Sequence, residues 1–144
     1  WQTLWREQIT MDATAMGKKV EGEALVKELD ALIKEKTANN TNLKGKTAVF
    51  CYFNPADLGK FYIYLPTDPR AAYLTDLGLQ FPESISKLGA DSFSGTVPAV
   101  KNGAVALIED GSELSASCTP SALSIPATID EYLEILGAAA SKVK

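Results

Sequence analysis

Two apolar stripes at helical spacing open the chain. The first joins residues three or four positions apart, namely Trp5, Ile9, Ala13, Met16 and Val20. The second covers residues 25–33, and the asparagine-rich run at 37–42 after it suits a helix end. Because this spacing is typical of one helix face, we predict a long helix over residues 2–36, which Gly17 can kink.

Residues that favour β-structure follow in three short runs. Residues 46–53 carry apolar or aromatic side chains on both faces, which is typical of an inner strand with both faces buried. A second strand is predicted at 60–65, and the few turn residues between the two strands favour an antiparallel hairpin. The run AVALIE at 104–109 predicts a third strand.

A short helix is predicted directly after the hairpin. The loop at 66–69 contains two prolines, so the helix begins at about residue 70 and covers 70–77, with Gly78 just past its end. With the long first helix, these elements divide the chain into a helical unit at 1–39 and an α/β domain at 40–144. The length of the first unit is typical of a strut rather than of a crossover.

The last helix is predicted over residues 120–136. Thr119 is a good N-cap before a proline at the first helical position, and Gly137 suits the end. Pro126 either kinks this helix or marks a second start. The run at 110–117 before it is predicted to be a polar loop. Short helical turns are also predicted at 79–88 and 96–102.

Composition excludes several classes of function. The chain has 144 residues, 46% of them hydrophobic and 22% charged, which fits one globular domain. The net charge of −4 and the absence of a basic run argue against nucleic acid as a partner. The chain contains no histidine, so it lacks the usual general base and imidazole metal ligand. Cys51 and Cys118 have no metal-site spacing. A metal site built from imidazoles and a hydrolase of the Ser-His-Asp or Cys-His kind are therefore excluded.

The order of these elements resembles the C-terminal lobe of iron-siderophore substrate-binding proteins of ABC importers. The resemblance covers nearly the whole chain. Four segments carry most of it: the helix at 1–36, AVFCYF at 48–53, YIYLPTDPRAAYLTDLG at 62–78 and VPAVKNGAVALIEDG at 97–111. It implies a three-layer α/β lobe of a two-lobed periplasmic-binding-protein fold, preceded by a long interlobe helix.

The same resemblance implies a function in iron uptake. Such a receptor is extracytoplasmic and often a lipoprotein, closes two lobes on a ferric siderophore or a related chelate, and delivers it to an ABC permease. The chelator already wraps the metal, so the resemblance implies no catalytic residue, no covalent chemistry, no metal site with direct coordination and no resident cofactor. The N-terminal lobe is absent from this chain, which begins at Trp1 as if cut. Any membrane contact is expected only through a lipid anchor outside the chain.

The chain departs from the family pattern after residue 92. Here the family places a further helix and strand, with a glutamate that docks on the permease, whereas Ser92 passes almost directly to the segment at 97–111. We therefore expect residues to be missing near 90–95. One Cα–Cα separation in that window should then clearly exceed the usual value of about 3.8 Å.

The candidate ligand-binding residues are Arg70, Tyr62, Tyr64, Tyr73, Ser115 and Ser117. Arg70 follows the second strand, where family members place an arginine that faces the chelate, but it can also be a surface arginine at a helix start. Tyr62 and Tyr64 share a strand face, and core packing is the alternative for them and for Tyr73. The two serines follow the third strand, where loop and cap chemistry is the alternative.

Three other functions stay open at this point. A chelatase of related fold would need a proton-transfer group near its cleft, which only carboxylate, Tyr or Lys side chains could supply. A haem- or cobalamin-binding protein of the same fold is the second, and an interaction domain without a small ligand is the third. Thermal shift against ferric siderophores, haem and cobalamin would separate these from a siderophore receptor.

Overall fold

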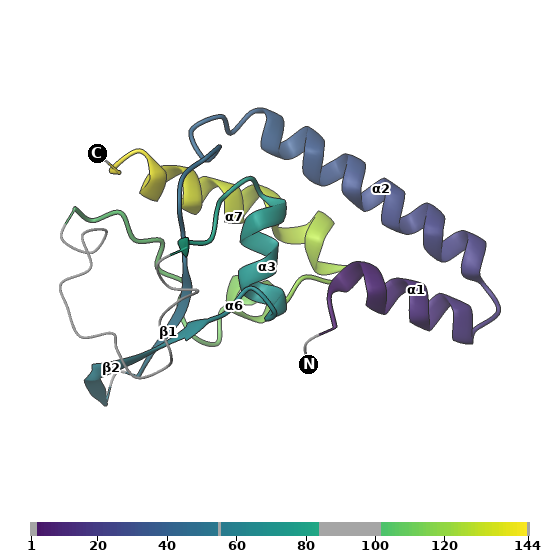
Figure 1. Cartoon of the computed structure of the whole chain (residues 1–144), viewed down its shortest axis with the longest axis horizontal. Coiled ribbons are helices and arrows are strands. Elements are labelled where there is room, and N and C mark those ends of the chain that lie inside the picture. The colour runs from purple at the N-terminus through teal and green to yellow at the C-terminus, as the bar shows by residue number, and fades with distance from the viewer. Residues whose placement is uncertain (1–2, 55, 84–101, 144) are drawn as a thin grey trace.

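The structure, a computed structural model, describes residues 3–54, 56–83 and 102–143. It is an α/β arrangement, as predicted, in which a two-stranded sheet lies at one end of the molecule and helices lie beside it (Figure 1). In chain order the elements are α1 (Trp5–Ala15), α2 (Lys19–Ala38), β1 (Phe50–Asn54), β2 (Asp57–Tyr64), α3 (Pro69–Asp76), α6 (Glu113–Ser117) and α7 (Ser124–Ala140).

The first two helices form an antiparallel pair rather than one strut. They lie side by side and project from the body of the molecule (Figure 1). Between them the chain reverses at residues 16–18, where Gly17 has φ of +70°, a conformation that glycine adopts without strain. The prediction of one helix over 2–36 is therefore wrong. The apolar spacing is real, but Met16 and Val20 lie at the turn and are exposed.

Close contact between α1 and α2 depends on one small residue. A Cβ atom added at Gly22 in α2 would lie 2.3 Å from the Cβ of Ala13 in α1, far inside van der Waals contact. Both residues are buried, so the two helix backbones approach here as closely as their side chains allow.

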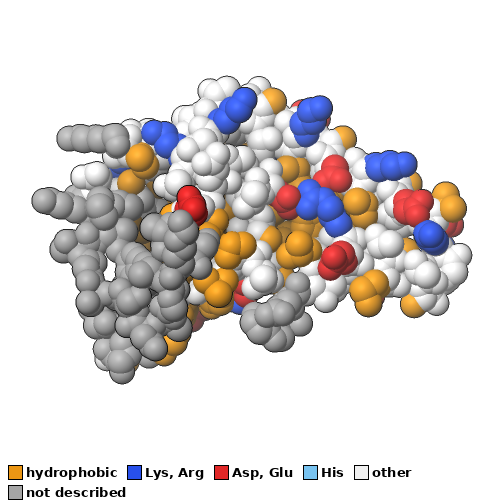
Figure 2. Space-filling model, viewed as in Figure 1, with side chains coloured by type: hydrophobic (Ala, Val, Ile, Leu, Met, Phe, Trp, Pro, Cys, Tyr) orange, Lys and Arg blue, Asp and Glu red, His pale blue; other side chains and the backbone are white. Residues whose placement is uncertain are grey.

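The core lies where α2, α3 and α7 meet. Helix α7 buries Ile125, Ile129, Tyr132 and Leu133 on one face, and the most deeply buried residues elsewhere include Leu43 and Leu77. On the face drawn in Figure 2, charged side chains of both signs are spread over the α1–α2 end of the molecule. No described helix is long and apolar enough to cross a membrane.

Helix α7 begins later than predicted. Ser121 and Ser124 bond reciprocally, because the backbone N–H of each donates to the hydroxyl of the other, at 2.9 and 3.1 Å. This pair displaces Thr119 as the start of the helix. Pro126 then falls in the first turn, where its missing N–H costs nothing, so it lies at the start of the helix and does not kink it. Gly137 does not end the helix, which continues to Ala140.

The two strands form the predicted antiparallel hairpin. Phe50 pairs with Tyr64 and Tyr52 with Tyr62. The earlier part of the first predicted strand contributes an isolated parallel bridge, between Thr47 and Gln80. The expected strand at 104–109 is not formed, because no described segment pairs with it and an extended chain becomes a strand only through such bonds.

Some predictions fall outside the described residues. They are the helical turns at 79–88, of which only the beginning is described, and at 96–102, and the abnormal junction expected near 90–95. Helix α3 closely matches the prediction for 70–77, and Gly78 follows it with φ of +93°.

Candidate functional site

Arg70 is held in place by the residue that caps its helix. The Asp68 carboxylate accepts the backbone N–H of Arg70 at 3.0 Å and so caps α3. The same carboxylate accepts Nε of Arg70 at 2.9 Å and Nη2 at 2.8 Å. The side chain of Asp68 is 4% exposed, whereas that of Arg70 is 30% exposed. A buried carboxylate therefore fixes a guanidinium that still reaches the surface.

This pairing shifts the pKa of both groups. Hydrogen bonds from the Arg70 side chain are the main cause that lowers the pKa of Asp68, against the opposing effect of burial. The pKa of Arg70 is raised mainly by the hydrogen bonds to Asp68. Both groups are therefore charged at neutral pH. Asp68 uses two of the five guanidinium N–H donors, and the other three are not used by it.

Arg70 also lies over an aromatic ring. Its guanidinium carbon is 3.8 Å from the ring centroid of Tyr64, the geometry of a cation–π contact. Tyr64 in turn meets Phe50 edge to face, with centroids 5.6 Å apart. The structure thus brings two of the candidates, Tyr64 and Arg70, into direct contact.

The aromatic face of the hairpin continues beyond Tyr64. Tyr62 lies on the same face and pairs across the hairpin with Tyr52, with ring centroids 6.4 Å apart. Both rings are exposed. This corrects the prediction that both faces of the first strand are buried, which is why Tyr52 was not among the candidates. Strand alternation alone gives no signal that separates a buried aromatic face from an exposed one.

Tyr73 belongs to the core rather than to a surface site. It is buried and stacks on Tyr132, with centroids 5.8 Å apart. Burial raises the pKa of Tyr73 well above its usual range. Its hydroxyl is buried and has no hydrogen-bond partner among the described residues. The choice of Tyr73 as a ligand contact is corrected by this burial, because a ligand at the surface cannot reach the ring.

The two candidate serines lie in a helix rather than in a loop. Ser112 caps α6 by accepting the backbone N–H of Ser115 at 3.1 Å, and the Ser117 hydroxyl donates to the carbonyl of Glu113 at 2.8 Å. The predicted loop at 110–117 is corrected because this cap allows the chain to form a helical turn. Burial raises the pKa of Cys118, just after α6, to about 11, and the charge of Arg70 partly offsets this effect.

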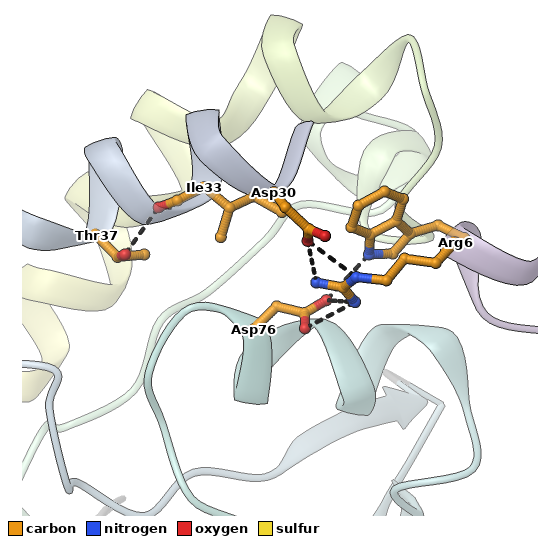
Figure 3. Close-up of polar contacts among 6 residues, drawn as sticks. Arg6, Asp30, Ile33, Thr37 and Asp76 are labelled. Atoms are coloured by element: carbon orange, nitrogen blue, oxygen red, sulfur yellow. Dashed lines mark hydrogen bonds and ion pairs between the residues drawn. The ribbon is translucent and has the colours of Figure 1, made fainter. Parts of the chain in front are cut away.

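A charged cluster that the sequence did not reveal joins α1, α2 and α3 (Figure 3). Arg6 donates to Asp30 at 2.6 and 2.9 Å and to both oxygens of Asp76 at 3.0 Å. The indole N–H of the buried Trp5 donates to Asp76 at 3.0 Å. Asp76 is the last residue of α3, and Arg70 lies in the first turn of the same helix, so the cluster anchors α3 at the end opposite Arg70. No sequence signal could have found it, because Arg6 and Asp76 are 70 positions apart.

A shallow cavity of about 300 Å³ lies beside this cluster. Its lining is mainly apolar and includes Leu4, Trp5, Pro66, Pro69 and Pro120. Among the described residues, no group of three or more Cys, Asp or Glu side chains could hold a metal ion. The guanidinium of Arg70, held by Asp68 and beside the Tyr64 ring, suits recognition of an oxygen-rich ligand by hydrogen bonds and ring contacts.

Comparison with known proteins gives the following. No protein-family model matches the chain, and no curated protein matches it significantly. Among solved structures, PiaA of Streptococcus pneumoniae TIGR4 in complex with ferrichrome is 40% identical, with a TM-score of 0.91 over 100% of this chain and 61% of that chain. A second structure, of the iron uptake ABC transporter substrate-binding protein PiaA from the same organism, is also 40% identical, with a TM-score of 0.89 over 99% of this chain and 62% of that chain.

The chain therefore spans about three fifths of the length of these solved proteins, and the match covers 99–100% of this chain. A sequence identity of 40% together with this agreement in fold goes well beyond a shared architecture. The similarity of this chain to the C-terminal lobe of iron-siderophore substrate-binding proteins is thereby confirmed.

Proposed function

We propose that this chain is the C-terminal lobe of an extracytoplasmic substrate-binding protein that takes up ferric siderophores through an ABC importer. One observation carries the proposal: over its whole length the chain is 40% identical to a protein whose structure was solved with ferrichrome. The role is binding without catalysis. The metal arrives wrapped in its chelator, which agrees with a chain that contains no histidine.

Arg70 and Tyr64 form the centre of the proposed site. The three guanidinium N–H groups that Asp68 does not use can donate to oxygen atoms of the chelate, while Asp68 and the Tyr64 ring hold the guanidinium in one orientation. A charge-assisted bond to a ligand oxygen contributes about 1.5–3 kcal/mol where water is partly excluded. A pre-positioned arginine loses little side-chain entropy on binding, which strengthens the interaction further.

The proposal implies three partners. An N-terminal lobe would form the opposite wall of the cleft, an ABC permease would receive the ligand, and a lipid anchor outside the chain would hold the protein at the membrane. Ser115 and Ser117 stay in the proposal as residues near the rim. Their contribution is smaller than that of Arg70, because the Ser117 hydroxyl already donates to a helix carbonyl.

The test is a titration of the full-length gene product with ferrichrome, in which quenching of the intrinsic protein fluorescence measures binding. We expect Arg70→Ala to weaken binding about tenfold or more, because it removes the charged donor. The affinity of Arg70→Lys should lie between those of the unmodified protein and Arg70→Ala, since lysine keeps the charge but lacks the planar guanidinium with its paired donors. Lys34→Ala is the matched control, because Lys34 is an exposed cation on α2, away from the hairpin.

Two results would contradict the proposal at different points. An unchanged dissociation constant for Arg70→Ala would remove Arg70 from the site but leave the function standing. Thermal shift against ferric siderophores, haem and cobalamin tests the function itself, since a ligand at 100 times its dissociation constant stabilises the protein by about 2.7 kcal/mol. Stabilisation by haem or cobalamin alone would replace the siderophore, and no stabilisation at all would refute the binding role.

A further inference from the structure

Two tyrosine rings lie exposed at the far end of the hairpin face that carries Arg70. Tyr52 is 43% exposed and Tyr62 is 60% exposed. Their ring centroids are 6.4 Å apart and their planes differ by 35°, so the two rings lie side by side as a tilted pair. We call this pair the tyrosine platform. Exposed large aromatic rings that adjoin one another typically mark a place where something binds.

The platform is continuous with the site around Arg70. Side chains two positions apart in a strand share a face and lie about 6.8 Å apart, which places Tyr62 one step from Tyr64. The register puts Tyr52 opposite Tyr62 and Phe50 opposite Tyr64, so the four rings form two successive rungs of one face. The guanidinium of Arg70 rests on the inner rung.

The opposite face of the hairpin has a different character. Cys51 and Ile63 pair across it, and both are half-buried. Burial raises the pKa of the Cys51 thiol, as expected for a side chain turned away from water. On the face of the tyrosine platform the inner rung is partly covered, because Phe50 packs against the core and Arg70 lies over Tyr64, whereas the outer rung, the tyrosine platform, stays open beside Arg70.

We propose that Tyr52 is a specificity-determining contact, and that the tyrosine platform supports the apolar periphery of the same chelate whose oxygen atoms Arg70 binds. This inference rests on the proposed function and deepens it. The spacing between the two rungs allows one ligand to contact both, because a ligand held by Arg70 at the inner rung extends over the outer rung about 7 Å away. Tyrosine rings supply a large, rigid contact area with few rotatable bonds, which suits a surface that selects ligands by shape.

The experiment compares single variants of the full-length gene product in the ferrichrome titration. We expect Tyr52→Ala to weaken binding about threefold to tenfold, the effect of one lost aromatic contact. Tyr52→Phe keeps the ring and should stay within about twofold of the unmodified protein. Cys51→Ala is the matched control, because Cys51 is the neighbouring residue on the opposite face. Urea unfolding of each variant shows whether folding is preserved.

Each outcome decides a separate point. A selective loss of affinity in Tyr52→Ala at unchanged stability supports the inference. Equal affinities for Tyr52→Ala and Cys51→Ala, with tight binding by the unmodified protein, overturn the role of Tyr52 and leave the proposed function intact. An equal loss in Tyr52→Phe and Tyr52→Ala overturns the role of the ring face. If the unmodified protein binds neither ferrichrome nor another ferric siderophore, both the inference and the proposed function fail.

Discussion

Replacing Gly22 with alanine tests how closely α1 and α2 pack. The new Cβ would lie 2.3 Å from the Cβ of Ala13, whereas carbon atoms in contact lie about 3.5–4.0 Å apart. The helices would have to separate by more than about 1 Å to admit it. We therefore expect Gly22→Ala to destabilise the protein, although alanine favours helix more than glycine does.

The magnitude follows from two opposing effects. Alanine in place of glycine inside a helix stabilises by about 0.8–1.0 kcal/mol. Overpacking of a well-packed contact costs about 1–3 kcal/mol. The net expectation for Gly22→Ala is a loss of about 1 kcal/mol in the free energy of unfolding. In a protein that already carries Ala13→Gly, the clashing methyl is gone and the next neighbour of the new Cβ is the Ile9 carbonyl oxygen at 3.5 Å.

The sign of the effect should therefore reverse. With Ala13→Gly in place, Gly22→Ala is expected to stabilise by up to about 1 kcal/mol, which gives a coupling of about 2 kcal/mol between the two sites. Urea unfolding followed by circular dichroism measures all four proteins of this cycle. Gly137→Ala in α7 is the matched control, because its Cβ would meet nothing nearer than 3.5 Å. Stabilisation by Gly22→Ala alone would refute the close approach of the helices.

Two further predictions concern charged groups. Asp76→Ala should lower the free energy of unfolding by about 1–3 kcal/mol, because it leaves the indole N–H of the buried Trp5 without its acceptor. Asp76→Asn keeps an acceptor for Trp5 and should cost less in the same urea assay, so equal losses would contradict this reasoning. Arg70 lowers the pKa of Asp68 in the folded protein below its unfolded value of about 3.9, so ionised Asp68 stabilises the fold. This contribution to the free energy of unfolding is complete above about pH 3.9 and is lost as the pH falls through the folded-state pKa. Asp68→Asn should remove this part of the acid dependence, and an unaltered pH profile between about pH 2 and 7 would rule it out.

Local signals made parts of the fold predictable. Helix α3 could be placed because Pro69 restricts its start and Gly78, with φ of +93°, permits its end. The hairpin followed from two short β-favouring runs with turn residues between them. The start of α7 could not be placed, because Thr119 and Ser121 both suit a helix start and only the bonds between Ser121 and Ser124 decide between them.

Long-range arrangements could not be read from spacing. An apolar stripe looks the same whether a helix continues or folds back, so the reversal at Gly17 was visible only as a kink. Arg70 was found because it follows the second predicted strand, where members of the resembling family place an arginine that faces the chelate. Its partner Asp68 and the exposure of Tyr52 were not found, because each depends on which side of a strand or helix faces the protein.

The charged cluster at Arg6 has a consequence for how the protein folds. Arg6 pairs with Asp30, 24 positions away, and with Asp76, 70 positions away. During synthesis the α1–α2 pair is complete long before α3 emerges, and its contacts are local in sequence, so it can form early. Asp76 then forms its ion pair with Arg6 and so fixes the α1–α2 pair to α3. Pulsed hydrogen exchange during refolding should show α1 and α2 protected before α3, and simultaneous protection of all three would contradict this order.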